Sequence, residues 1–142
     1  MGASTVKTLV VPSRRQQIVA AQKTILKQIE QHNYGEQARF AIRLALDEAA
    51  CNALRHGNHE DPDKHITFQY EITDQRVSIS VTDEGDGFDP GVLPDPTHEA
   101  NLDRPCGRGV MLMLSYMTEV SFSNGGRTIT LIKDRNCRKP EA

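Results

Sequence analysis

The feature of this sequence that most restricts its fold is a change of hydrophobic periodicity along the chain. Apolar side chains recur at helical spacing over residues 14–31 and again over 36–55. Later in the chain they alternate with polar ones in short runs, at 66–72, 77–81, 119–124 and 127–133. Because helices and antiparallel hairpins are segregated rather than interleaved, the pattern predicts an α+β fold, a two-layer α/β sandwich with helices on one face of the sheet.

The N-terminal half begins with a short β-branched run at 5–11, which predicts a strand before the helices. Pro12 breaks this strand, and Ser13 is the residue expected to cap the helix that follows. The second helix, over 36–55, is apolar or small on nearly every side. We therefore expect it to be buried on more than one side, so that any polar residue inside it needs an explanation.

The stretch at 83–109 follows the first hairpin and is rich in Gly, Pro and Asp. Connections of this length in compact domains are usually functional lids or disordered segments. A further apolar helix is expected at 108–118, and Asn124-Gly125 suits a tight turn in the last hairpin. The polar end of the chain, from about residue 134, is expected to be loose.

Length and composition exclude several classes of protein. The 142 residues predict a single domain over 1–142, and a formal charge of −2 argues against a nucleic-acid binder. No stretch approaches the roughly 20 apolar residues that a membrane span needs, and the N-terminus does not resemble a signal peptide. Three scattered cysteines predict free thiols in a reducing compartment, so we expect a cytoplasmic protein.

Glu48 and Asn52 are polar residues within the otherwise apolar second helix. Four residues apart, they project from the same helix face. Ala45 and Ala49 flank them, and because alanine side chains are small we expect an uncrowded helix face that a ligand could approach. A carboxylate and an amide oxygen suit Mg²⁺ or the activation of a hydroxyl. Such a pair alone is also compatible with an ordinary polar stripe on a helix.

Residues 83–89, DEGDGFD, follow directly after a predicted strand. Gly85 and Gly87 allow the backbone to come close to a planar or charged ligand. Asp83, held at the end of the strand, can accept a hydrogen bond from an exocyclic amine. The simpler interpretation is an acidic turn or a calcium loop. An EF-hand is a poor match, because its twelve-residue spacing and closing Glu are missing and the flanking segments are strands.

Gly107-Arg108-Gly109 stands immediately before the predicted helix at 108–118. A helix N-terminus presents unpaired N–H groups, so glycines there make a site for phosphate, and Arg108 adds a charged donor. The motif is neither a Walker A loop nor a Rossmann fingerprint. Cys106 precedes it, and the sequence assigns this thiol no role.

In this order the three motifs resemble those of the GHKL ATPase superfamily, which includes histidine kinases and gyrase B. The matching segments are LDEAACNALRHGN (46–58), VTDEGDGFDP (81–90) and GRGVMLMLSYMTEV (107–120). The sequence looks most like the short branch of anti-sigma-factor serine/threonine kinases. The resemblance spans nearly the whole chain and implies a Bergerat-type ATP-binding fold with a mixed, mainly antiparallel sheet.

The resemblance also implies a role for each matching residue. Glu48 is implied to act as a general base and Asn52 as a ligand of Mg²⁺. Asp83 is implied to bond the amine of adenine, in a base pocket shaped by Gly85 and Gly87.

For the phosphates, the resemblance points to Gly107 and Gly109 as the cradle, with Arg104 and Arg108 as candidates for contact from the loop. A threonine of the last strands commonly lies near adenine in this family. Thr128 and Thr130 both qualify, and Thr128 is the residue we assign to the site.

The chemistry implied by the resemblance is transfer of the γ-phosphoryl group of ATP to a serine or threonine of an anti-anti-sigma (STAS) partner. A sigma factor is implied as a second partner, and a homodimer as the assembly. The alternative is an ATP-sensing module that regulates a partner without phosphotransfer, because the same residues would bind ATP in either case. A scaffold with merely acidic loops would explain the periodicity but not the three motifs together.

Overall fold

The computed structural model describes residues 6–59, 61–85 and 116–135. Its elements are β1 (Lys7–Pro12), α1 (Arg15–Gln31), α2 (Glu36–Asn52), the π-helical turn η1 (Ala53–Gly57), β2 (His65–Ile72), β3 (Arg76–Thr82), β4 (Glu119–Ser123), the 3-10 turn η4 (Asn124–Gly126) and β5 (Thr128–Asp134). The predicted first strand, two helices and two hairpins are therefore present, with small shifts at their ends. The helix expected at 108–118 falls almost wholly outside the described residues.

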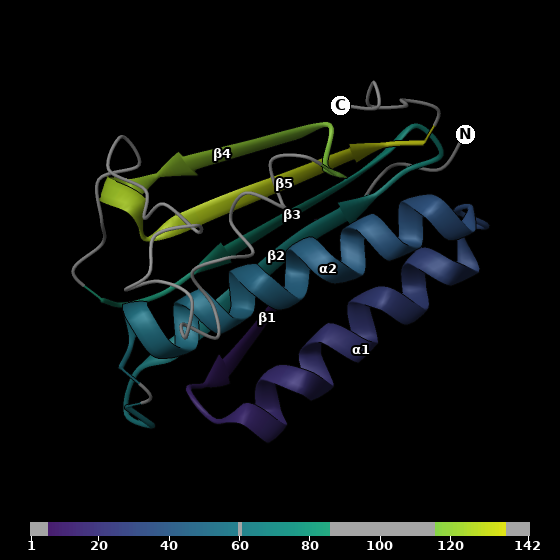
Figure 1. Ribbon diagram of the computed structural model, residues 1–142. Coiled ribbons are helices and arrows are strands. Elements are labelled where there is room, and N and C mark those ends of the chain that lie inside the picture. Colours follow the sequence, from purple (N-terminus) through teal and green to yellow (C-terminus); the bar gives the residue numbers. More distant parts are fainter. Residues whose placement is uncertain (1–5, 60, 86–115, 136–142) are drawn as a thin grey trace, which may run out of the picture.

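The strands form one five-stranded sheet in the order β1-β2-β3-β5-β4, in which every neighbouring pair is antiparallel. A parallel pair, which a mixed sheet would contain, is absent from these described strands. Both α1 and α2 lie on one side of the sheet and run next to each other (Figure 1). The two-layer α/β sandwich predicted from the periodicity is thereby confirmed.

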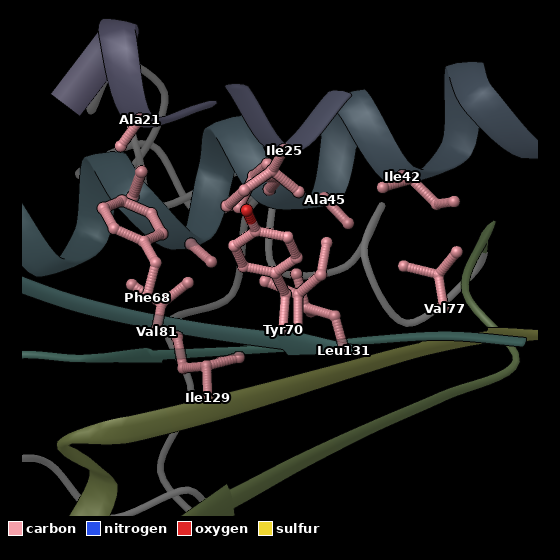
Figure 2. Packing of buried hydrophobic residues seen from close by; sticks show 14 of the residues in the cluster. Ala21, Ile25, Ile42, Ala45, Phe68, Tyr70, Val77, Val81, Ile129 and Leu131 are labelled. Carbon is pink, nitrogen blue, oxygen red and sulfur yellow. The ribbon is translucent and has the colours of Figure 1, made fainter. Parts of the chain in front are cut away.

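The hydrophobic core lies between the helix layer and the sheet (Figure 2). Alternate residues of β2, β3 and β5 point toward the helices, because successive side chains of a strand leave opposite faces. The helices meet them with apolar residues at helical spacing. The largest fully buried side chains are Phe68, Ile25, Ile29, Ile42, Leu46, Ile66, Ile79, Met117, Leu131, Val77 and Val81.

The opposite face of the sheet is lined by hydroxyl groups where β3 and β5 are paired. The hydroxyl oxygens of Ser80 and Thr130 are 3.0 Å apart, and those of Thr82 and Thr128 are 2.9 Å apart. Each pair joins directly opposed residues of the two strands. Residues bonded in this way point away from the helices, which matters for the assignment of Thr128.

Ser13 does not cap α1, so that prediction is wrong. The helix begins after Arg14, whose side chain makes no capping hydrogen bond. Ser13 is buried instead; its hydroxyl donates to the carbonyl of Lys64 at 2.8 Å and accepts from Nδ2 of Asn58 at 2.8 Å. It therefore joins the corner between β1 and α1 to the start of β2, a tertiary role that local capping preferences do not reveal.

Two expectations drawn from composition can also be compared with the structure. Over the described part of the chain, no helix is long and apolar enough to cross a lipid bilayer. Cys51, on α2, is disulfide-bonded, so the expectation of three free thiols is wrong. The other two cysteines, Cys106 and Cys137, lie outside the described residues.

Candidate functional site

Glu48 and Asn52 lie one turn apart near the end of α2, and both are half-buried. Their neighbours Ala45 and Ala49 are 0% exposed, and Figure 2 shows Ala45 directed at the sheet. The expectation that these alanines leave an open approach for a ligand is therefore wrong. Their small side chains instead let α2 pack close to the sheet, where Asp83 directly follows the end of the central strand β3.

The helix does not stop at Asn52 but continues directly into the π-helical turn η1. The amide of Asn58 donates to the carbonyl of Ala53 at 2.9 Å, which is the wider hydrogen-bonding step of a π-helix. Such single turns occur frequently at functional sites. Here the turn carries Gly57 and Asn58 to the end of β3.

Gly57 and the Asp83–Gly85 turn are in direct backbone contact. A Cβ added to Gly57 would lie 2.3 Å from Cγ of Asp83, and one added to Gly85 would lie 2.0 Å from the carbonyl oxygen of Gly57. Both distances are far inside van der Waals contact, so neither position has room for a side chain. The glycines allow the end of α2, which carries Asn52, to pack against Asp83.

Asn58 fixes this contact through its side chain, which is 0% exposed. Its Nδ2 donates to the hydroxyl of Ser13 at 2.8 Å and to the carbonyl of His65 at 3.0 Å. Its Oδ1 accepts from the amide of Glu84 at 2.7 Å. One buried amide therefore joins η1, the β1–α1 corner, the start of β2 and the turn after β3.

The acidic residue next to Asp83 adds a further link to β2. Oε2 of Glu84 accepts a hydrogen bond from the amide of His65 and lies 3.6 Å from Nδ1 of the same histidine. Both side chains are substantially exposed, so this contact contributes little to stability. The turn is thus held mainly by Asn58 from inside the protein.

Asp83 itself is half-buried and directed against η1. Its Oδ1 accepts from the amide of Gly85 at 2.8 Å, and its own amide donates to the carbonyl of Arg127 at 3.0 Å. Burial raises the pKa of the carboxyl group, while the Gly85 hydrogen bond and the positive charges of Arg127 and Lys64 act in the opposite direction. The carboxylate is therefore oriented and partly desolvated, as a hydrogen-bond acceptor for a ligand needs to be.

The structure does not bring Thr128 or Thr130 together with Asp83. Their hydroxyl groups pair with Thr82 and Ser80 on the face of the sheet away from the helices. Arg127 reaches the Asp83 turn instead, because its Nε donates to the carbonyl of Gly85 at 2.6 Å.

The remaining predicted site residues cannot be placed. Outside the described residues lie Gly87, Arg104, Cys106, Gly107, Arg108 and Gly109. The predicted phosphate cradle therefore stays a prediction. Of the predicted residues, the structure brings together the end of α2 with Asn52, and the turn with Asp83 and Gly85.

Sequence reasoning missed two residues of this region, Asn58 and Arg127. Asn58 entered the sequence analysis only as the last residue of the matching segment 46–58, yet a polar residue directly after a buried helix and a glycine was a usable signal. Arg127 had no such signal, because its role depends on which residues of β5 stand opposite the end of β3.

The side-chain oxygen atoms near the end of α2 are chemically suited to bind a hard cation. A carboxylate and an amide oxygen one helical turn apart, Glu48 and Asn52, are ligands that Mg²⁺ accepts. No group of three or more His, Cys, Asp or Glu side chains that could hold a metal occurs within the described ranges. Mg²⁺ at nucleotide sites commonly takes only one or two protein ligands besides phosphates and water, so this donor set fits it.

The chain is similar to curated proteins of one kind. It is 29% identical to the serine-protein kinase RsbW of Bacillus subtilis (strain 168) over 102 residues, which cover 67% of this chain and 64% of that protein. It is 32% identical to the serine-protein kinase RsbW of Staphylococcus epidermidis over 99 residues, which cover 64% of this chain and 62% of that protein. The matched region thus spans somewhat less than two thirds of the length of these relatives.

A solved structure shares the fold. The crystal structure of the RsbU and RsbW domains of Rv1364c from Mycobacterium tuberculosis superposes with a TM-score of 0.61 at 13% sequence identity, covering 92% of this chain and 31% of that one. The family model of the histidine kinase-like ATPase domain matches residues 11–133, which run from the last residues of β1 into β5 and include the whole described site. The chain therefore belongs to the histidine kinase-like ATPase family.

Proposed function

We propose that this protein is an ATP-binding anti-sigma regulatory factor with serine/threonine protein kinase activity. The observation that carries the proposal is the packing of Gly57 against Asp83, which sets the helix end bearing Glu48 and Asn52 beside the turn bearing Asp83 and Gly85. The carboxylate of Glu48 and the amide of Asn52, both on α2, are thus near the oriented and partly desolvated carboxylate of Asp83. The family membership and the relatives named serine-protein kinase RsbW support the same activity.

In this proposal one set of residues binds the adenine base and another set binds the phosphates. Asp83 accepts a hydrogen bond from the amine of the adenine, and the glycine at 85 lets the backbone approach the base. Asn52 holds Mg²⁺, which would neutralise charge on the phosphates when bound. Glu48 orients the hydroxyl of the acceptor protein and takes its proton. Gly107, Arg108 and Gly109 remain the proposed phosphate contacts, outside the described residues.

The partners in the proposal are proteins. The acceptor is a serine or threonine of a STAS-type anti-anti-sigma protein, and a sigma factor is the regulated partner. We further propose that the protein is cytoplasmic and acts as a homodimer. These assignments rest on the similarity to anti-sigma kinases rather than on a described contact.

The alternative is an ATP-sensing module that regulates a partner without phosphotransfer. Glu48 separates the two proposals, because a protein that only binds ATP has no need of a general base. Candidate STAS proteins from the same genome are incubated with radiolabelled ATP and either wild type or Glu48→Ala. The kinase predicts labelling that Glu48→Ala abolishes while ATP binding persists. ATP binding without labelling of any candidate, in wild type and variant alike, would favour the sensor.

A further inference from the structure

The structure points to Arg127 as a residue of the base-binding site, beyond those that the sequence motifs name. Arg127 directly precedes β5 and stands opposite Asp83, because the amide of Asp83 donates to its carbonyl at 3.0 Å. This bond extends the antiparallel β3–β5 ladder one step past the Thr82–Thr128 pair. Residues opposed in this way have side chains near one another.

The guanidinium of Arg127 is held at the turn rather than left to solvent. Its Nε donates to the carbonyl of Gly85 at 2.6 Å, although the side chain as a whole is exposed. Among the described residues, no hydrogen bond engages its Nη1 or Nη2. The planar guanidinium, held through Nε, therefore presents Nη1 and Nη2 as hydrogen-bond donors at the rim of the turn.

The position of Arg127 complements that of Asp83. Burial raises the pKa of the Asp83 carboxyl group, and the positive charge of Arg127 acts in the opposite direction, yet the two side chains form no ion pair within the described part of the chain. Gly57 also packs against Asp83, since a Cβ added to Gly57 would lie 2.3 Å from Cγ of Asp83. An acceptor and a donor thus stand next to each other at this turn.

An adenine edge has the matching arrangement. Its exocyclic amine is a donor, and the ring nitrogens beside it are acceptors. We propose that Arg127 donates a hydrogen bond to a ring nitrogen flanking the amine that Asp83 accepts, which makes it a specificity-determining residue for the base. This inference rests on the proposed nucleotide site.

The test combines removal of the side chain with removal of single ligand atoms. Calorimetry compares binding of ADP, 1-deaza-ADP and 7-deaza-ADP to wild type and to Arg127→Ala. A hydrogen bond to a charged donor predicts roughly 10- to 100-fold weaker ADP binding by the variant. For the deaza ligand that lacks the contacted nitrogen, the same substitution should have little further effect, because the two changes remove one interaction.

Arg76→Ala is the matched control. Arg76 pairs with Asp134 at the far end of the same two strands, with Nε 3.4 Å from Oδ1. Its loss should leave ADP affinity unchanged. Where Arg127→Ala lowers the melting temperature too far for calorimetry, Arg127→Lys keeps the charge but removes the planar donor group, and it should show the same insensitivity to the deaza ligand.

The outcomes separate this inference from the proposed function. Wild type that does not bind ADP would overturn both. Wild-type binding that Asp83→Asn abolishes, but that Arg127→Ala leaves intact, would overturn the role of Arg127 alone. An Arg127→Ala variant that weakens ADP and both deaza ligands by one common factor would also overturn it, because the effect would then be a general one of charge.

Discussion

The amide of Glu84 donates a 2.7 Å hydrogen bond to the side-chain oxygen of Asn58, a residue that is 0% exposed. This bond ties the turn after β3 to the end of η1. Asp83, the residue before Glu84, is thereby held at a set place relative to Asn52, which precedes η1. The two halves of the proposed site are positioned by one buried amide.

Replacing Asn58 with alanine should destabilise the whole domain. The change removes the hydrogen bonds to Ser13, His65 and Glu84 and leaves buried polar groups without these partners. We expect the free energy of unfolding to fall by about 2–5 kcal/mol, measured by urea denaturation. Gln37→Ala, at an exposed site on α2, is the control and should change it by less than about 0.5 kcal/mol. Equal effects of the two substitutions would contradict the role given to Asn58.

Gly57→Ala should separate the end of α2 from the Asp83 turn. The new Cβ would lie 2.3 Å from Cγ of Asp83, so the turn has to move. We expect weaker ATP binding, by about tenfold or more, because base recognition depends on the placement of Asp83. Gly35→Ala is the matched control, since a Cβ there meets no atom within 4 Å. If Gly57→Ala bound ATP as tightly as Gly35→Ala, the contact would have no part in the site.

The sequence was sufficient to predict the layers of this fold because both periodicities are strong. The helical spacing of Ile18, Ile25 and Ile29 and the alternation of Val77, Ile79 and Val81 each reflect one buried face. The same patterns located Glu48, Asn52 and Asp83 within their elements. Such signals depend only on residues close together in the chain.

Features that depend on tertiary contacts could not be predicted from the sequence. Thr128 was assigned to the base pocket, yet its face is set by the β3–β5 register, and a shift of one residue reverses every side chain. Serine is a residue type favoured at helix N-caps, but the hydroxyl of Ser13 is hydrogen-bonded to Asn58 and Lys64 instead. Neither register nor a partner 45 residues away can be read from local spacing.

Asp83 should give stability a specific dependence on pH. Burial raises the pKa of its carboxyl group above the ordinary value of 3.8. A carboxyl group with a higher pKa in the folded state binds its proton more tightly there, so the free energy of unfolding decreases as pH rises from 3.8 through the folded pKa. The destabilisation by the ionised group therefore develops across that window and is complete above it.

Asp83→Asn removes this ionisation while keeping an oxygen for the Gly85 amide. We expect the stability of the variant, relative to wild type, to be greatest above the folded pKa of Asp83. The difference should shrink as the pH falls through that pKa toward 3.8. Urea titrations across the acid range measure it. A difference that stays constant over this range would show that burial does not perturb the carboxyl group.

The most direct test of the account is calorimetry of ATP binding to wild type and Asp83→Asn, each with and without Mg²⁺. We expect Mg²⁺-dependent binding by wild type and loss of that binding in Asp83→Asn, whose folding is checked by its urea transition. Folded, nucleotide-free wild type that does not bind ATP would contradict the central claim. So would an Asp83→Asn variant that binds ATP as tightly as wild type.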